Sequence, residues 1–363
     1  MRTILRLLVL GCAATGSLAL AGTALAKTPQ LLVSGSQSTA ASAETVIDVK
    51  ETKEDAAPLR IAIYIPIGYT ANITQAAGTQ IGTVNADLQA LAISPDAIIQ
   101  AEGTVLTAAP ATYATNTCSP GAHAAVWLLH VTVSGQTLDV PVYVDPTTGA
   151  EAAFSSAKLV LCLPNPYEQA QPPTSCAAFG AKIIDAKLTM AAGVITNPPA
   201  TGTYLWRAVV TPWTVNSPLP NQGGTVETQA IVNLPAAATL KAKVTTVRKT
   251  KKVRGKRRTT VRNSVLLSGR LLEKLQGVAG GKVTFLGGAK RVGTATTSST
   301  GAFSKSLLLT KKTTFRATVV VPTREVGCVT PLPASLGVTG CVSATLAGYT
   351  LTTGAVTAVP KKR

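Results

Sequence analysis

The sequence predicts an all-β protein built from two antiparallel β-sandwich domains. The chain combines 46% hydrophobic residues with only 14% charged residues, and its other polar residues are largely Thr, Ser and Gly. Its 22 prolines and 30 glycines separate many short runs in which apolar and polar residues alternate. A period of two is typical of strands that bury one face, and Val and Thr favour the strand conformation. Short strands at regular spacing, with frequent turns, favour sandwiches.

The first 26 residues have the features of a cleaved signal peptide. Arg2 and Arg6 form a basic start, an apolar stretch follows, and Ala24-Leu25-Ala26 supplies the small residues that signal peptidase requires before Lys27. A membrane-spanning anchor is the alternative, but residues 15–17 (TGS) interrupt a stretch that is already short for a span of about 20 residues. We therefore expect a bacterial protein that is secreted or held at the cell surface, with no transmembrane anchor in the mature chain.

The region before residue 236 divides into a leader and a first domain. Residues 27–57 are polar and low in complexity, which is typical of a flexible leader. The domain, residues 58–235, begins with RIAIYIPIGY, in which four isoleucines occupy every second position. Its clearest hairpin covers residues 122–145, and a helix is plausible only over residues 84–101. Further strands are predicted at 157–164, 181–190, 202–213 and 225–235. The residues of this domain resemble no family that we recognise.

Charge separates the two domains. Residues 27–235 contain 8 Lys and Arg against 14 Asp and Glu, whereas residues 236–363 contain 24 Lys and Arg against 2 Asp and Glu. Such an asymmetry favours a boundary near Pro235 and a basic second domain over residues 236–363.

The second domain carries a resemblance over residues 260–321. The runs SVLLSGRL, VAGGKVTFLGG, RVGTATTSSTGAFSKSLLL and TTFRATVVV follow one another there. This succession resembles the immunoglobulin-like β-sandwich modules of bacterial surface and secreted proteins. The sequence departs from their pattern at residues 298–300 (SST), where an Asp or Asn often precedes the Gly, and at Phe315, where Tyr is common. The resemblance implies a spacer, adhesive or structural role and supplies no catalytic residue.

Five cysteines follow the signal peptide, and an exported protein favours disulfides for them. Cys328 and Cys341 are the only two in the second domain and are expected to pair, with a stabilisation of about 3 kcal/mol. In the first domain one further pair is expected among Cys118, Cys162 and Cys176, either Cys118 with Cys162 or Cys162 with Cys176. The thiol left over is expected to act as a small buried apolar group.

A competing hypothesis is an exported hydrolase or a metal-dependent enzyme. His123 and His130 lie on the predicted hairpin, and Asp139 and Asp145 lie on its returning strand, so a site in the region Cys118–Asp145 is conceivable. The sequence contains no zinc-ligand spacing, nucleophile elbow, Walker loop or dinucleotide-binding glycine run. We expect a non-enzymatic protein with no catalytic residue, cofactor or metal, and interpret the two histidines as part of a polar outer face.

The most unusual segment is residues 246–264, TVRKTKKVRGKRRTTVRNS. Its nine basic residues are Arg248, Lys249, Lys251, Lys252, Arg254, Lys256, Arg257, Arg258 and Arg262. One interpretation is a solvated hairpin that turns at Gly255, in which Lys and Arg discourage pairing with other sheets. The other is a site for anionic envelope polymers or lipid headgroups, because nine cations repel one another unless anions gather nearby.

A specific nucleic-acid partner is not expected for this segment. Single-strand recognition uses aromatic side chains on which bases stack. The segment contains no aromatic residue, and the whole protein contains only 4%.

Overall fold

The computed structural model describes residues 28–361 except 92, 134, 168–180 and 255. The predicted signal peptide, Cys176 and the predicted turn residue Gly255 therefore lie outside the described residues. The fold is all-β, and the short helices in the described residues are the 3-10 turns η1 (Pro110–Tyr113), η2 (Gly149–Ala153), η4 (Gln222–Gly224) and η5 (Ala334–Leu336). No helix of the described part is long and apolar enough to cross a membrane.

The largest element is a 13-stranded sheet. In spatial order its strands are β1 (Gln30–Gly35), β2 (Thr45–Lys50), β10 (Ala181–Met190), β5 (Gln80–Ala90), β6 (Ile98–Ala108), β7 (Ala125–Val133), β8 (Gln136–Pro146), β9 (Ser155–Cys162), β3 (Pro58–Pro66), β12 (Gly202–Pro212), β13 (Val226–Leu234), β22 (Cys341–Leu346) and β21 (Arg324–Val326). Neighbouring strands are antiparallel except β13 and β22, which are parallel and so depart from the wholly antiparallel arrangement expected from the sequence. The short strands β4 (Thr70–Ala71) and β11 (Ile195–Thr196) pair separately.

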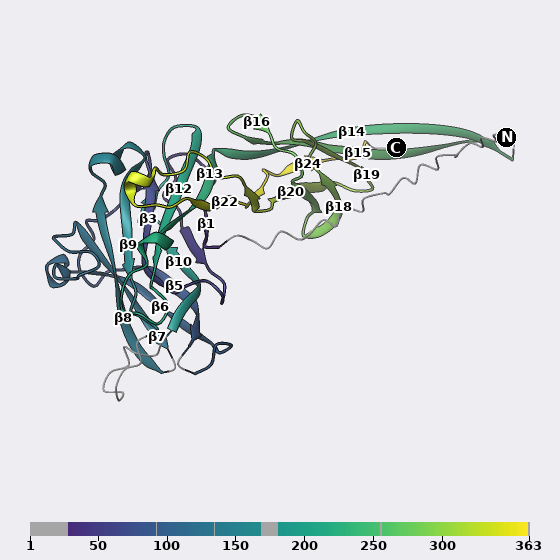
Figure 1. Cartoon of the computed structure of the whole chain (residues 1–363). Helices are drawn as coiled ribbons and strands as arrows, with labels where there is room; N and C mark the ends of the chain where they lie inside the picture. Colours follow the sequence, from purple (N-terminus) through teal and green to yellow (C-terminus); the bar gives the residue numbers. More distant parts are fainter. Residues whose placement is uncertain (1–27, 92, 134, 168–180, 255, 362–363) are drawn as a thin grey trace, which may run out of the picture.

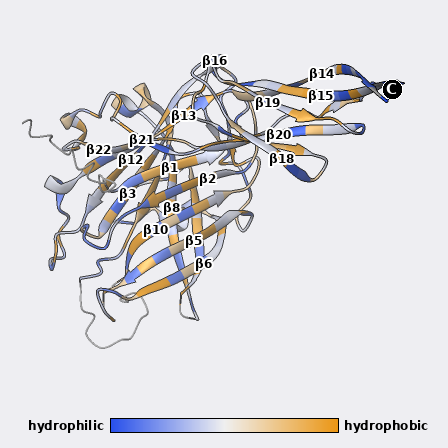
Figure 2. Cartoon of the chain, turned by 90° about the vertical axis from the view of Figure 1, so that its right-hand side faces the viewer, coloured by the Kyte–Doolittle hydropathy of each residue, from blue (hydrophilic) through white to orange (hydrophobic). Residues whose placement is uncertain are grey.

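The large sheet curls so that its first strand, β1, contacts β13 and β22 near the other end of the strand order. The backbone N–H of Leu31 in β1 donates to Thr228 Oγ1 in β13 over 3.1 Å, and Thr345 Oγ1 in β22 donates to the carbonyl of Leu31 over 2.6 Å. The inner face is apolar and packs around the fully buried side chains of Trp127 and Trp206. Figure 2 shows the hydrophobic residues distributed along the strands of this sheet. Burial of this inner face is the main source of stability for this part of the chain.

Three expectations about the chain before residue 236 and its boundary need correction. Residues 27–57 are not simply a flexible leader, because β1 and β2 lie there and bury Leu31, Val33, Ile47 and Val49. Residues 84–90 and 98–101 belong to β5 and β6 and not to a helix, and Val84 and Ala101 are buried in the core of the large sheet. The division at residue 235 does not separate the two sheets completely, because β21 and β22 return to the first sheet.

The rest of residues 236–361 forms a module of two sheets that share one core. One sheet contains β14 (Ala236–Val253), β15 (Lys256–Glu273), β16 (Gln276–Gly277) and β19 (Ala302–Leu308). The other contains β18 (Lys290–Thr296), β17 (Lys282–Gly287), β20 (Thr313–Val321), β23 (Tyr349–Thr352) and β24 (Val356–Ala358). Leu267 and Phe303 from the first sheet and Phe285 and Val319 from the second belong to the same buried cluster.

Two disulfides lie among the described residues, with sequence separations of 44 and 13. Cys328 is bonded to Cys341 beside the returning strand β22, and Cys118 is bonded to Cys162 at the end of β9. The second bond selects one of the two pairings that the sequence left open. It links the loop after η1 to a central strand of the large sheet.

Candidate functional site: a projecting basic arm

β14 and β15 form a hairpin that extends beyond the residues paired with the neighbouring strand β19. Each strand has 18 residues, and their register continues without a break from the pair Ala236–Glu273 to the pair Val253–Lys256. The third strand, β19, pairs with β15 only over residues 264–270. The remaining part, residues 246–253 paired with residues 256–263, is a two-stranded ribbon that extends away from the large sheet (Figure 1). We refer to residues 246–263 as the basic arm.

The sequence of the basic arm favours an isolated ribbon. Thr and Val have high strand propensity, and paired hydroxyl side chains stabilise neighbouring strands. Thr246 Oγ1 donates to Asn263 Oδ1 over 2.6 Å, and the hydroxyls of Thr250 and Thr259 are 3.0 Å apart. Asn263 Nδ2 also donates to the carbonyl of Lys361 over 3.1 Å, which supports the arm where it leaves the module. These contacts matter because a lone two-stranded ribbon is only marginally stable in water.

The register assigns each side chain of the hairpin to one of two faces. Successive side chains on a strand point to opposite faces, and paired residues share a face. The face that contains Leu240 and its partner position Gly269 also contains Val265 and Leu267, which are buried in the module core. The other face is the outward face, and it begins at the pair Thr239–Arg270.

The outward face carries a regular row of cations. From the pair Thr239–Arg270 to the pair Val253–Lys256 there are eight outward pairs, and seven of them contain a Lys or Arg whose side chain is exposed. From base to tip these residues, which we call the cation row, are Arg270, Lys241, Lys243, Arg262, Lys249, Lys251 and Lys256. The remaining pair, Thr245–Ser264, contributes hydroxyls only.

The other predicted basic residues lie close to the tip. Arg248, Lys252 and Arg257 are exposed on the opposite face, where Lys252 and Arg257 are directly paired. Arg254 lies in the turn with a φ of 49°, and the side chain of Arg258 lies outside the described residues. Like charges in a direct cross-strand pair are destabilising, so the tip holds a repulsion that a bound anion would relieve.

No carboxylate among the described residues forms an ion pair with the basic arm. Residues 236–363 contain only two acidic residues, Glu273 and Glu325. Glu273 is buried and accepts hydrogen bonds from Asn233 Nδ2, over 3.0 Å, and from the Tyr349 hydroxyl, so it is engaged at the base of the hairpin. Glu325 lies on β21 in the large sheet and accepts a hydrogen bond from Gln30. None of the ion pairs among the described residues involves the basic arm.

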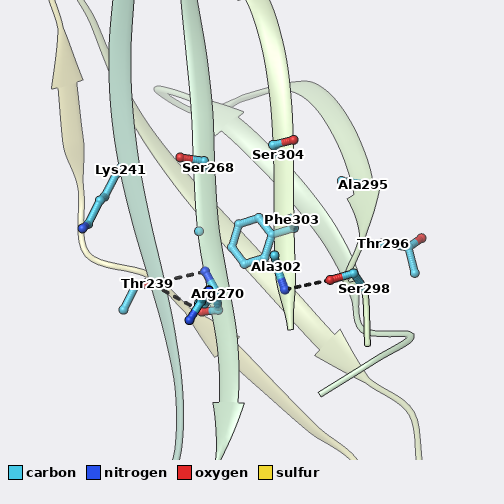
Figure 3. A pocket seen from close by; sticks show the side chains of 11 residues that line it. Thr239, Lys241, Ser268, Arg270, Ala295, Thr296, Ser298, Ala302, Phe303 and Ser304 are labelled. Atoms are coloured by element: carbon cyan, nitrogen blue, oxygen red, sulfur yellow. Dashed lines mark hydrogen bonds between the residues drawn. The ribbon is translucent and has the colours of Figure 1, made fainter. Parts of the chain in front are cut away.

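A pocket of about 600 Å³ lies where the cation row begins. Its lining residues are Thr239, Lys241, Ser268, Gly269, Arg270, Ala295, Thr296, Ser298, Ala302, Phe303 and Ser304 (Figure 3). Lys241, Ser268 and Ser304 form one line across β14, β15 and β19, and Thr239, Arg270 and Ala302 form the next. The pocket therefore combines two cations with several hydroxyl groups and contains no acidic side chain.

The histidines and aspartates of the enzyme hypothesis form two separate pairs. His123 Nδ1 lies 2.9 Å from Asp145 Oδ2, and His130 Nδ1 lies 2.7 Å from Asp139 Oδ1. Asp139 and Asp145 are six positions apart on β8, which corresponds to about 20 Å. His123 is buried, and its Nε2 also contacts the carbonyl of Ser119 at 3.0 Å, so both ring nitrogens are occupied by the protein itself. Within the described residues no three His, Cys, Asp or Glu side chains are grouped closely enough to hold a metal ion.

Sequence reasoning missed three members of the cation row. Lys241, Lys243 and Arg270 lie outside the dense basic segment of residues 246–264. The available signal was the spacing of two between Lys241 and Lys243, repeated at Lys249 and Lys251. This spacing becomes informative only when one uninterrupted register is known to join the two regions.

Comparisons with protein-family models, with characterised proteins and with solved structures found no match to this chain.

Proposed function

We propose that this is an exported, non-enzymatic binding or structural protein of the bacterial cell envelope or extracellular space, held to anionic envelope polymers or lipid headgroups by its basic arm. The observation that carries the proposal is the projecting arm itself. It presents exposed cations on both faces, and none of the ion pairs among the described residues neutralises them. Such a surface lowers its own repulsion by gathering anions.

The rest of the chain supports an extracellular setting. The two disulfides are compatible with an oxidising compartment, where such bonds persist. The predicted signal peptide would deliver the chain there. The module of residues 236–321 and 349–358 would then act as an immunoglobulin-like sandwich that supports the arm, in line with the resemblance over residues 260–321. The two-sheet core of this module suits that role, because it holds the base of the hairpin rigidly.

Retention on isolated cell envelopes at increasing salt concentration tests the proposal. Binding through cations and phosphate or carboxylate groups releases counterions, so the protein should elute as salt increases. A variant with Arg254→Ser, Lys256→Ser, Arg257→Ser and Arg258→Ser should elute at lower salt.

A matched control removes four exposed cations from elsewhere in the module, with Lys282→Ser, Lys290→Ser, Arg291→Ser and Lys311→Ser. This control has the same net charge as the arm variant and should behave nearly as the wild type. Unchanged retention of the arm variant, an equal loss in the control, or retention that salt does not reverse would each contradict the proposal.

A further inference from the structure

We infer that the cation row binds one flexible, linear polyanion, which starts in the pocket at Arg270 and Lys241 and follows the outward face of the hairpin to Lys256 at the tip of the basic arm. The inference rests on the proposed function and adds to it the shape of the partner and the face that it occupies. It depends on the cation row, which only the strand register reveals.

The spacing of the row fits a polymer with repeating anionic groups. Outward residues on one strand are two positions apart, which corresponds to about 7 Å. The row extends from the pair Thr239–Arg270 to the pair Val253–Lys256, or fourteen residues along β14, so its length is about 48 Å. Each of seven pairs contributes one exposed cation, and only the pair Lys251–Arg258 contains a second basic residue, so the row is long and narrow. A single extended polymer chain can place an anionic group beside each of these cations in turn.

The pocket can bind one end of the polymer chain. Lys241 and Arg270 supply charge, and Ser268 and Ser304, which are paired across β15 and β19, supply hydroxyl groups (Figure 3). Ammonium, guanidinium and hydroxyl groups are the usual donors to phosphate oxygens. A phosphate-bearing polymer is therefore the chemistry that this lining favours.

Two broader partners fit the same surface less well. A membrane surface is usually engaged by several apolar and aromatic side chains, whereas residues 246–263 contain no aromatic residue and Val247 is the large apolar side chain that is exposed among those described there. A nucleic-acid duplex or a membrane presents charge over a wide area. Either one would bind mainly at the tip, where the charge is concentrated on both faces, and less at the base, where the cations are single. The tip residues on the opposite face are Arg248, Lys252 and Arg257.

The test compares two variants that lose the same charge from different faces. The row variant carries Lys241→Ser, Lys243→Ser and Arg270→Ser, and the opposite-face variant carries Arg248→Ser, Lys252→Ser and Arg257→Ser. All six side chains are exposed, and thermal unfolding checks that both variants keep the stability of the wild type. The probe is linear polyphosphate, in lengths shorter and longer than the cation row, with binding measured by calorimetry at several salt concentrations.

The inference predicts a difference between the two faces. Each phosphate contact of a single strand contributes about 0.7 to the slope of log K against log salt, so the row variant should lose about 2 from that slope and bind long chains at least tenfold more weakly. The opposite-face variant should retain most of the slope. Affinity of the wild-type protein should rise with chain length until the chain reaches about 48 Å and change little beyond it.

Equal losses in the two variants, or affinity that does not depend on chain length, would overturn the inference. The proposed function would survive that result, because retention on envelopes depends on the arm as a whole. Duplex DNA or phosphatidylglycerol vesicles that bind more tightly than polyphosphate of matched length would also overturn it, in favour of a nucleic-acid or membrane partner.

Discussion

Replacement of Glu51 by Gln should make the protein more stable at pH 8 and leave its stability nearly unchanged at pH 4.5. Glu51 follows β2, and only 6% of its surface is exposed. Its Oε2 has no hydrogen-bond partner in the described structure. Burial raises the pKa of this carboxyl from 4.5 to about 8, against the opposing effect of Lys182 and with a smaller contribution from Asp55.

The direction of the pH effect follows from which state holds the proton. Between pH 4.5 and pH 8 the folded protein keeps a proton on Glu51 that the unfolded chain has already released. The contribution of Glu51 to stability is therefore fully present below pH 4.5 and is lost as the pH rises toward 8. A pKa difference of this size corresponds to about 5 kcal/mol, which is lost at about 1.4 kcal/mol for each pH unit.

Lys182 cannot simply neutralise the carboxylate. Lys182 is itself buried, and its ammonium donates to the backbone carbonyls of Thr52, over 2.6 Å, and Lys53, over 3.2 Å, and to that of Asp55. Burial lowers the pKa of Lys182, although nearby carboxylates oppose that effect. The lysine is thus committed to three carbonyl groups of the loop after β2, while Glu51 lacks a donor for one oxygen.

Urea unfolding of the wild type and of Glu51→Gln at pH values from 4.5 to 8 measures the effect. The difference in the free energy of unfolding should grow with pH in favour of Glu51→Gln. Burial also raises the pKa of Asp48, to about 6, but this group is present in both proteins, so its effect largely cancels in the difference. Glu54→Gln, at an exposed position three residues away, is the matched control and should show no such trend. A difference between wild type and Glu51→Gln that stays constant with pH would refute the reasoning.

Three further changes have expected outcomes that follow from single contacts. Glu227→Gln should lower the free energy of unfolding by about 3–5 kcal/mol in urea titration, because it leaves the buried guanidinium of Arg207 without its counter-charge; a loss below about 1 kcal/mol would contradict this. Replacement of Cys328 and Cys341 together by Ser should cost about 3 kcal/mol, measured by thermal unfolding against wild type, since the bond closes a short loop with a sequence separation of 13. Gly269→Ala should lower the free energy of unfolding by about 1–3 kcal/mol, because the new methyl group would lie 2.0 Å from the carbonyl oxygen of Thr239. Gly340→Ala is the control: a methyl group at this position would meet no atom within 4 Å, so the substitution should be nearly neutral in the same assay.

Local patterns in the sequence predicted most of the strands. The hairpin over residues 122–145 is present as β7 and β8, because its alternating apolar residues and its turn agree on one register. The strands expected at 157–164, 181–190, 202–213 and 225–235 correspond to β9, β10, β12 and β13. The period of two is a strong signal where four or more apolar residues repeat.

The sequence could not predict contacts that depend on distant segments. β1 and β2 each bury only two large apolar residues, such as Leu31 and Val33, so their alternation is too short to stand out in a polar region. The return of β22 to pair in parallel with β13 joins residues more than 100 positions apart, and no local pattern marks such a pairing. The same limitation hid the full cation row, because Arg270 and Lys241 lie beside each other only through the hairpin register.

The return of the chain to the large sheet also bears on how the basic arm would bind. The chain leaves the large sheet after Leu234, builds the arm, and re-enters the sheet at β21 and β22. At the base of the hairpin that carries the arm, Lys274 N donates to the carbonyl of Pro235 over 2.9 Å, and Glu273 accepts from Asn233. The arm is therefore anchored from both of its ends. A flexible basic tail with the same charge would lose conformational freedom when it bound, whereas an anchored ribbon has already lost it during folding. Anchoring thus favours a function in which the order of the cations along the arm matters as well as their number.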